Sequence, residues 1–232
     1  MLEVRGITGG YEDIGVLHGV DLSVREGEIV GLLGPNGHGK STLLKAISGI
    51  HPPSGGTISF RGEEITRLAA HEVVARGIAY IPEERFLFAD MPVLENLQLG
   101  AYTRRARPQL ERNLEMVYEL FPRLKERRRQ HCSTLSGGES QMVAIARGLM
   151  SGASLLLVDE PSIGLSPGLK RGVYESIERI NAETGITVLL VEQEIDYALR
   201  LSERIYLLKR GRVEFEKPAA EADVDEIHEA YF

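Results

Sequence analysis

Thirteen residues set the fold: Ile29-Val30-Gly31-Leu32-Leu33-Gly34-Pro35-Asn36-Gly37-His38-Gly39-Lys40-Ser41. The first five form a continuous apolar run, which is typical of a strand buried on both faces of a parallel sheet. Residues 34–41 match the pattern G-x-x-x-x-G-K-[ST], and the residues that follow, 41–48, favour a helix. A strand, a glycine-rich loop and a helix in this order predict a phosphate-binding loop in an α/β protein.

Each part of this loop suits a nucleotide triphosphate. Glycines let successive backbone N–H groups turn inward to form a nest for an anion, and the helix adds the positive end of its dipole. Lys40 can reach the β- and γ-phosphates, and the Ser41 hydroxyl can ligate Mg²⁺. The alternative is a tight glycine turn without a ligand. The predicted ATP-binding residues of the loop are Gly34, Pro35, Asn36, Gly37, His38, Gly39, Lys40, Ser41 and Thr42, and the His38 side chain is expected to be exposed, without chemistry of its own.

A second apolar run ends in two carboxylates. Leu155-Leu156-Leu157-Val158 precedes Asp159 and Glu160. In open α/β sheets, ligands bind at the carboxyl ends of the strands, so this pair is expected beside the phosphate loop. Asp159 is suited to hold Mg²⁺ through its water shell, and Glu160 is suited to act as a general base on the attacking water.

The rest of the chain predicts a parallel α/β core interrupted by helices. Alternating patterns predict strands at 2–7, 17–25, 57–60, 78–81, 154–158, 186–191 and 204–209, with helices at 168–182 and 194–201. Residues 93–150 read mainly as helix, broken by Pro108, Pro122 and Gly137-Gly138. The tail after Pro218 predicts a short docking helix. The helical third therefore resembles an insertion between two halves of the core.

Composition narrows the function classes. The chain has 232 residues, of which 43% are hydrophobic and 26% charged, as in a soluble globular protein. Its net charge of −7 argues against a nucleic-acid binder. A single cysteine, Cys132, fits a reducing compartment. The sequence shows no signal-peptide pattern and no apolar run of about 18–20 residues. These features predict a cytoplasmic protein that something else must hold at a membrane.

A second glycine-rich element precedes the helix in the middle of the chain. The element is Leu135-Ser136-Gly137-Gly138-Glu139. The helix after it has an apolar face with the spacing i, i+3, i+4 and i+7, formed by Met142, Ile145, Ala146 and Leu149. Glycines at a helix start leave backbone N–H groups open to an anion, which makes a second phosphate site. Two such elements in one chain suggest that two chains share each nucleotide. These residues resemble the signature motif of the ATP-binding-cassette (ABC) ATPases, and the resemblance covers essentially the whole chain.

The resemblance implies one ABC ATPase domain over residues 1–232. Its fold is α/β, with a P-loop NTPase (RecA-like) core, a small antiparallel β subdomain and a helical signature subdomain at about 86–151. Two subunits dimerise head to tail, so Leu135, Ser136, Gly137, Gly138 and Glu139 would face the partner's ATP. Tyr11, 23 residues before Gly34, matches the aromatic residue that stacks on adenine, with Val16 beside it. Tyr11 could equally be an aromatic residue of a strand turn. Residues 162–167 match the loop that crosses the dimer interface.

Two positions depart from the family pattern. Glu83 replaces the usual glutamine, which senses the membrane partner, and Gln193 replaces the usual histidine, which contacts the γ-phosphate. A carboxylate can still ligate Mg²⁺, and a glutamine can still donate to phosphate but cannot become cationic. Either the subunit is degenerate or its branch tolerates these residues. Because Glu160 and both phosphate motifs are intact, we favour the second account, with Glu160 as the essential base and Gln193 as a positioning group.

Several segments indicate one branch of the family. Pro82-Glu83, Val191-Glu192-Gln193 and Glu229-Ala230-Tyr231 resemble one of the two ATPase subunits of branched-chain amino acid importers. The resemblance implies a second ABC ATPase as dimer partner, two membrane permeases, an indirect link to a binding protein, and a place on the cytoplasmic face of the membrane. The alternatives are an importer of urea or short amides, an exporter subunit, a soluble assembly ATPase, and a regulatory module that holds ATP without turnover.

Overall fold

The chain folds around two β-sheets, which the computed structural model describes for residues 1–12 and 14–231. The larger sheet has six strands in the order β10-β9-β3-β8-β7-β6. Neighbouring strands are parallel from β9 to β6, and β10 pairs antiparallel with β9 at one edge. The bounds are β3 Ile29–Leu33, β6 Ile78–Ile81, β7 Leu155–Asp159, β8 Thr187–Glu192, β9 Arg204–Lys209 and β10 Arg212–Pro218.

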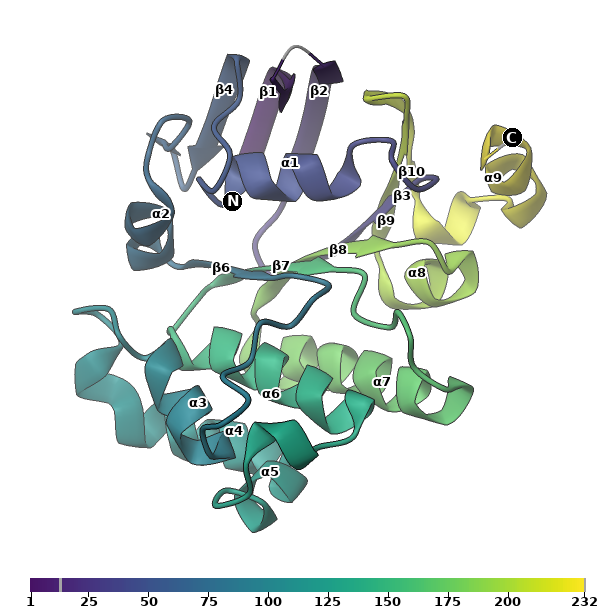
Figure 1. Ribbon diagram of the computed structural model, residues 1–232. Coiled ribbons are helices and arrows are strands. Elements are labelled where there is room, and N and C mark those ends of the chain that lie inside the picture. The colour runs from purple at the N-terminus through teal and green to yellow at the C-terminus, as the bar shows by residue number, and fades with distance from the viewer. Residues whose placement is uncertain (13, 232) are drawn as a thin grey trace.

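The central strands are apolar throughout because both faces of the sheet are covered. Leu155 and Leu157 of β7 point into one hydrophobic core, and Leu156 and Val158 point into another on the opposite face. Figure 1 shows the antiparallel strands and α1 above the sheet and most of the other helices below it. A strand buried on both faces therefore needs a continuous apolar run rather than an alternating pattern.

The smaller sheet is antiparallel, in the order β2-β1-β4-β5. Its strands are β1 Leu2–Tyr11, β2 Ile14–Val24, β4 Gly55–Phe60 and β5 Glu63–Glu64. Helix α1 (Lys40–Ile47) lies between the two sheets, where Leu43, Leu44 and Ile47 are buried in the same core as side chains of both. Helix α2 (Ala70–Arg76) follows this sheet and leads into β6.

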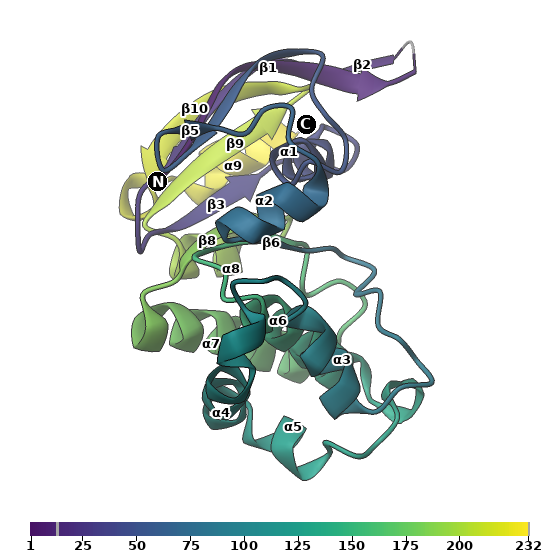
Figure 2. The same ribbon diagram turned by 90° about the vertical axis from the view of Figure 1, so that its left-hand side faces the viewer.

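Helices cover the other face of the central sheet. Between β6 and β7 lie α3 (Val93–Gly100), α4 (Leu110–Leu120), α5 (Pro122–Glu126) and α6 (Gly137–Met150). After β7 come α7 (Pro167–Thr184), α8 (Ile195–Leu201) and α9 (Val224–Tyr231), with 3₁₀ turns at Arg107–Gln109, Cys132–Thr134 and Ala219–Glu221. Figure 2 shows α3–α6 together at the end of the molecule farthest from β1 and β2.

The predicted fold class is confirmed, and the prediction missed β10, α2 and the two-residue strand β5. Strands 78–81 and 204–209 have the predicted bounds, and the other predicted strands and helices shift by a few residues. The core was predicted as parallel, but β10 adds an antiparallel edge strand. Its residues alternate between exposed and half-buried, so no long apolar run marks it. Helix α2 was also missed, since it buries only Val73 and so has no apolar stripe. Within the described ranges 1–12 and 14–231, no helix combines the length and apolar character needed to cross a bilayer.

Candidate nucleotide-binding site

The phosphate loop leaves β3 through a glycine that no other residue could replace. Gly34 has φ = 154°, and a Cβ there would lie 2.1 Å from the carbonyl oxygen of Leu208 in β9. The loop ends at Gly39, the N-cap of α1, with φ = 106°. Only glycine adopts such angles without strain, so the loop keeps its path from the end of β3 into the first turn of α1.

Lys40 is buried and lies inside the loop. Its Nζ donates to the carbonyl oxygens of Gly34 and Pro35, at 2.6 and 3.2 Å. The same nitrogen is 3.3 Å from Glu160 Oε1. The charge of Lys40 is therefore held by the loop and by the predicted base, and a phosphate entering the loop would compete with both for the ammonium group.

The carboxylate of Asp159 faces the start of α1. Ser41 Oγ donates to its Oδ1 at 3.1 Å, and the Tyr80 hydroxyl donates to its Oδ2 at 2.8 Å. Burial raises the pKa of Asp159, although both hydrogen bonds favour the ionised form. Ser41 and Asp159 are 118 residues apart in the chain, and they meet because β3 and β7 end at the same edge of the sheet.

Glu160 is buried and has a backbone conformation that is rare for its residue type. Its φ is +42°, in the left-handed region, while its N–H donates to the Val191 carbonyl oxygen at 3.0 Å. Gln193 Nε2 donates a hydrogen bond to Glu160 Oε2. Local strain of this kind persists only where the surroundings fix it, and it is often found at functional sites. The neighbouring strand thus holds the carboxylate toward Lys40.

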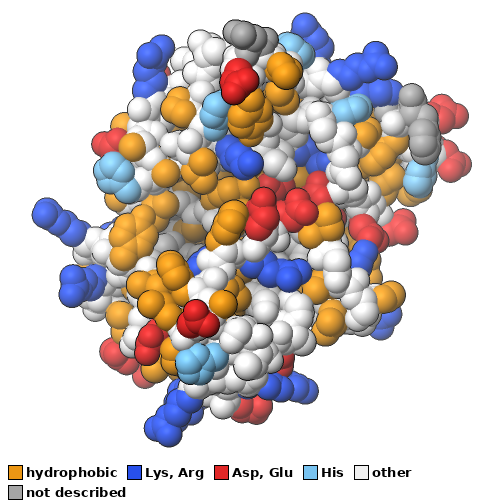
Figure 3. All heavy atoms as spheres, viewed as in Figure 1, with side chains coloured by type: hydrophobic (Ala, Val, Ile, Leu, Met, Phe, Trp, Pro, Cys, Tyr) orange, Lys and Arg blue, Asp and Glu red, His pale blue; other side chains and the backbone are white. Residues whose placement is uncertain are grey.

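A pocket of about 370 Å³ opens beside these groups. Most of the predicted ATP-binding residues of the loop line this pocket, and so do Glu83 and Glu160. The full lining is Tyr11, Val16, Asn36, Gly37, Gly39, Lys40, Ser41, Thr42, Glu83, Glu160 and Ile163. The loop residues Gly34, Pro35 and His38 lie outside this lining. Figure 3 shows acidic side chains gathered near the middle of this face.

The neighbours of Glu83, Tyr11 and His38 affect what these three predicted site residues can do. Burial and the negative charges of Glu160, Glu84 and Asp159 raise the pKa of Glu83. Tyr11 is 41% exposed, ends β1 opposite Ile14, and stacks on His51 with the ring centres 4.7 Å apart. His38 Nδ1 accepts from the Arg210 N–H at 3.3 Å, which directs that ring toward the β9–β10 turn.

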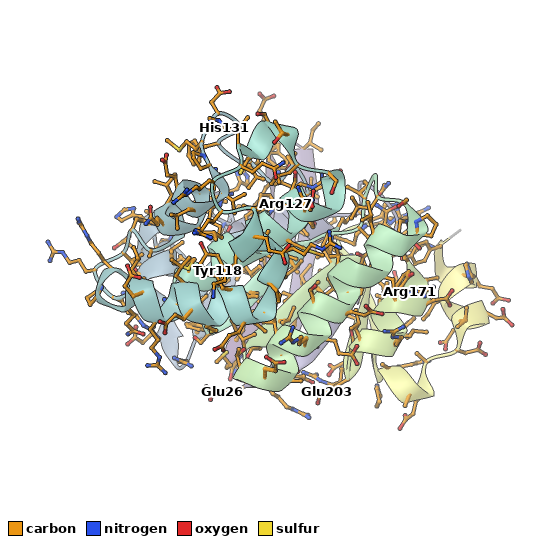
Figure 4. All side chains as sticks on the ribbon, turned by 90° about the horizontal axis from the view of Figure 1, so that it is seen from below. Glu26, Tyr118, Arg127, His131, Arg171 and Glu203 are labelled. Carbon is orange, nitrogen blue, oxygen red and sulfur yellow. The ribbon has the colours of Figure 1, made fainter. Side chains whose placement is uncertain are left out.

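The signature residues lie on the helical part, at the start of α6. Ser136 caps the helix: its Oγ accepts from the Glu139 N–H, and Glu139 Oε2 accepts from the Ser136 N–H at 3.0 Å. The hydrogen bond from the Ser136 N–H lowers the pKa of Glu139. The positive charge of the nearby Arg127 also lowers it, by a smaller amount. Arg127, labelled in Figure 4, lies 2.8 Å from Glu139. Leu135 is half-buried ahead of the cap.

Gly137 and Gly138 are in close contact with the loop that follows β7 and with α7. A Cβ on Gly137 would lie 3.0 Å from the Leu165 side chain, and one on Gly138 would lie 2.9 Å from that of Leu169. Gly137 therefore lets α6 approach the loop that the sequence predicts to cross a dimer interface, and Gly138 lets it approach α7. The five signature residues lie outside the pocket lining.

The sequence did not reveal the tyrosines and the extra carboxylate around the acidic pair. Tyr80 lies in β6, in register with Leu157 of β7, and its hydroxyl reaches Asp159. A buried tyrosine normally finds a hydrogen-bond partner, so a tyrosine in a buried strand was a usable signal. Glu192 ends β8, is 2% exposed, and accepts from the Tyr174 hydroxyl at 2.6 Å.

We expect Glu192 to make folding stability depend on pH. Burial raises the pKa of Glu192 to about 7, and the negative charge of Glu160 contributes to the rise. Hydrogen bonds from Tyr174 and from the Gln193 N–H lower the pKa but do not cancel this rise. Because the folded pKa lies above the unfolded value, Glu192 destabilises the folded state increasingly as pH rises from about 4.5 to 7. Glu192→Gln should remove this dependence, which amounts to about 3 kcal/mol at most. Urea unfolding of both proteins between pH 5 and 8 measures the difference; equal pH slopes would contradict the assignment.

Comparisons with known proteins identify the family. Residues 17–163 match the model of the ABC transporter family. The high-affinity branched-chain amino acid transport ATP-binding protein BraG of Pseudomonas aeruginosa is 44% identical over 92% of this chain and 91% of its own length. The probable branched-chain amino acid transport ATP-binding protein LivF of Archaeoglobus fulgidus is 38% identical over 95% and 93%.

Solved structures agree with the sequence comparison. The ADP conformation of an ATP-binding cassette of an ABC transporter superposes with a TM-score of 0.83 at 26% identity, covering 98% of both chains. A dimeric bacterial ABC transporter cassette has a TM-score of 0.77 at 31% identity over 94% of this chain and 99% of its own. This chain belongs to the ABC transporter family, as one of its ATP-hydrolysing, ATP-binding cassettes.

Proposed function

We propose that this chain is the ATPase subunit of an importer of branched-chain amino acids. The 44% identity to BraG over more than nine-tenths of both chains carries this assignment. It is supported by a pocket that residues of the phosphate loop and Glu160 line, and by the hydrogen bond from Ser41 of that lining to Asp159. The chain would bind ATP, dimerise with a second ABC ATPase, and sit against two permeases on the cytoplasmic face of the membrane. The solute itself would be recognised by the permeases and their binding protein.

Mg²⁺ fits the residues at the start of α1. Ser41 Oγ and the Asp159 carboxylate are in contact, with Glu83 at the same pocket, and oxygen atoms are the ligands that Mg²⁺ prefers. In residues 1–12 and 14–231, no cluster of three or more His, Cys, Asp or Glu side chains is arranged to hold a metal. The ion would therefore be held by Ser41 and Asp159, with Glu83 as a further ligand, together with the nucleotide phosphates. When bound, it neutralises charge on the phosphate oxygens.

The other residues of the pocket divide the reaction among them. Lys40 would exchange its contacts with loop carbonyls for the β- and γ-phosphates, which also frees Glu160 from its ion pair. Glu160 would then accept a proton from the attacking water as the water oxygen bonds to the γ-phosphorus and the bond from that phosphorus to the bridging oxygen of ADP breaks. Gln193 would keep the carboxylate of Glu160 in place and donate to the γ-phosphate. Tyr11 and Val16 would contact the adenine.

An apolar groove on the same face suits the membrane partner. It has a volume of about 400 Å³ and is bounded by β6, α3 and α6. Its exposed hydrophobic side chains are Phe88, Leu99 and Tyr102, at 52%, 41% and 58%. Figure 3 shows hydrophobic side chains gathered on this left-hand part of the face. Pro82, beside Glu83, also lines the groove, so a permease segment seated there would contact the loop that reaches the nucleotide.

A charged side chain in this groove should weaken assembly with the permease. In Leu99→Glu or Tyr102→Glu, binding would have to bury an unpaired carboxylate, so we expect at least about tenfold less permease in pull-downs. Ile50→Glu is the matched control, because Ile50 is 53% exposed and does not line the groove. Basal ATP hydrolysis by the purified variants should be unchanged. Equal permease capture by Leu99→Glu, Tyr102→Glu and the wild type would place the permease elsewhere.

The function is tested by capture from membranes. A tagged Glu160→Gln variant, loaded with Mg·ATP, would be used to retrieve partners from detergent-solubilised source membranes for identification by mass spectrometry. Recovery of a second ABC ATPase and two permeases supports the importer, and uptake assays of those permeases with leucine, isoleucine, valine and urea identify the solute class. Recovery of soluble assembly factors alone would overturn the transport assignment.

A further inference from the structure

The C-terminal helix α9 is fastened to the core beside the nucleotide site. Ile227 is fully buried in a hydrophobic cluster that also contains Leu33, the last residue of β3. Lys217 of β10 lies 2.5 Å from Glu226 and ties the helix to the edge strand. Figure 1 shows α9 at the side of the molecule formed by β9, β10 and α8. The helix is therefore held by both packing and an ion pair.

From this position, Tyr231 reaches the phosphate loop. The Gly34 N–H donates to the Tyr231 hydroxyl at 3.1 Å. The carbonyl oxygen of Gly34 accepts from Lys40 Nζ at 2.6 Å, and the Leu208 carbonyl blocks any side chain at Gly34. Gly34 is thus the point where β9, α9 and Lys40 meet: Tyr231 accepts its N–H from 197 residues away, and Lys40 donates to its carbonyl oxygen from six residues away.

We propose that Tyr231 is a positioning residue for ATP binding, whose hydroxyl fixes the first peptide of the phosphate loop and so keeps the loop in its nucleotide-binding conformation. The proposal rests on the proposed ATPase function but concerns a residue outside the pocket lining. The residue acts through Gly34 and does not touch the nucleotide itself.

The energetics of this contact favour a role in affinity. Without the hydroxyl, the N–H of the buried Gly34 would lose its partner, and a buried donor without a hydrogen bond is costly. Burial and the charges of Glu160 and Glu192 raise the pKa of Tyr231 to about 12, so the phenol stays neutral around pH 7. The neutral hydroxyl accepts the Gly34 N–H, and its removal is the change that takes this acceptor away.

Tyr231→Phe tests the proposal because it keeps the ring and removes only the hydroxyl. We expect the Kd for a fluorescent ATP analogue and the KM for ATP to rise about three- to tenfold, with kcat at saturating ATP changed less than about twofold. Hydrogen exchange of the peptide that contains Gly34 should become faster. Ile227→Ala, which loosens α9 without touching the loop, should raise the Kd in the same direction.

The matched control is Tyr118→Phe. Tyr118 lies on α4, as Figure 4 shows, and its buried hydroxyl has no hydrogen-bond partner among the described residues. This variant should leave the Kd, KM and exchange at Gly34 unchanged. An unchanged Kd and unchanged exchange in folded Tyr231→Phe would overturn the proposal, as would a fall in kcat alone. Failure of the wild type to bind or hydrolyse ATP would instead overturn the proposed function, which separates the two.

Discussion

Glu160→Gln should lower kcat for ATP hydrolysis by about a thousandfold and leave ATP affinity unchanged or slightly higher. The glutamine side chain has the same shape and can still accept from Gln193, but it cannot take a proton from water. It also removes a negative charge that lies 3.3 Å from Lys40 in the free protein. Phosphate release gives kcat, and binding of a fluorescent ATP analogue gives the affinity. The ATP-bound variant should accumulate as a dimer in size-exclusion chromatography.

Gln193→Ala shows whether Glu160 or Gln193 contributes more to kcat. It leaves the base in place but removes a hydrogen bond to Glu160 Oε2. We expect kcat to fall about tenfold, because the carboxylate is still fixed by the backbone of Glu160 and its contact with Val191. A loss as complete as that in Glu160→Gln, with ATP binding retained, would show that Gln193 belongs to the essential chemistry.

Lys40→Ala should act on binding rather than turnover, raising the Kd for ATP by at least about a hundredfold. Lys40 is the cation of the pocket lining, where it faces Glu160 and lies near Glu83. Without its charge, those carboxylates would repel the triphosphate. Removing one partner of this buried ion pair should also lower the thermal stability of the free protein. Titration with a fluorescent ATP analogue and thermal unfolding measure the two effects.

Lys45→Ala is the control for this variant. Lys45 is on the same helix but only half-buried, and it does not line the pocket. Its loss should leave the Kd for ATP within about twofold of the wild type. Equal Kd values for Lys40→Ala and the wild type would mean that the loop does not bind the triphosphate through this lysine.

Sequence patterns predicted where the candidate site residues lie when their placement depends on local chain geometry. The phosphate loop has its strand, its glycines and its helix within a short segment, so the pattern itself specifies the fold of residues 29–47. Asp159 and Glu160 follow a buried strand, and the rule that ligands bind at the carboxyl ends of strands places them correctly.

Contacts that depend on packing between distant segments were not predictable in the same way. Nothing near Tyr80 in the sequence shows that its hydroxyl meets Asp159, because the contact depends on β6 lying beside β7. The Tyr174–Glu192 contact likewise depends on how α7 crosses β8. The edge strand β10 was not predicted because its residues alternate between exposed and half-buried and form no apolar run. In each case the missing information is the relative placement of elements.

The position of Gly34 has a consequence for how the protein is made on the ribosome. The loop emerges early in synthesis. Leu208 of β9, whose carbonyl oxygen leaves no room for a side chain at Gly34, and Tyr231 of α9, which accepts the Gly34 N–H, are among the last described residues to follow. Lys40 likewise meets Glu160 only after β7 has been translated. A nascent chain therefore carries the complete loop sequence long before it can hold ATP. Nucleotide capture during translation would report completion of the whole sheet, and a chain that stalls before β9 should emerge unable to bind ATP.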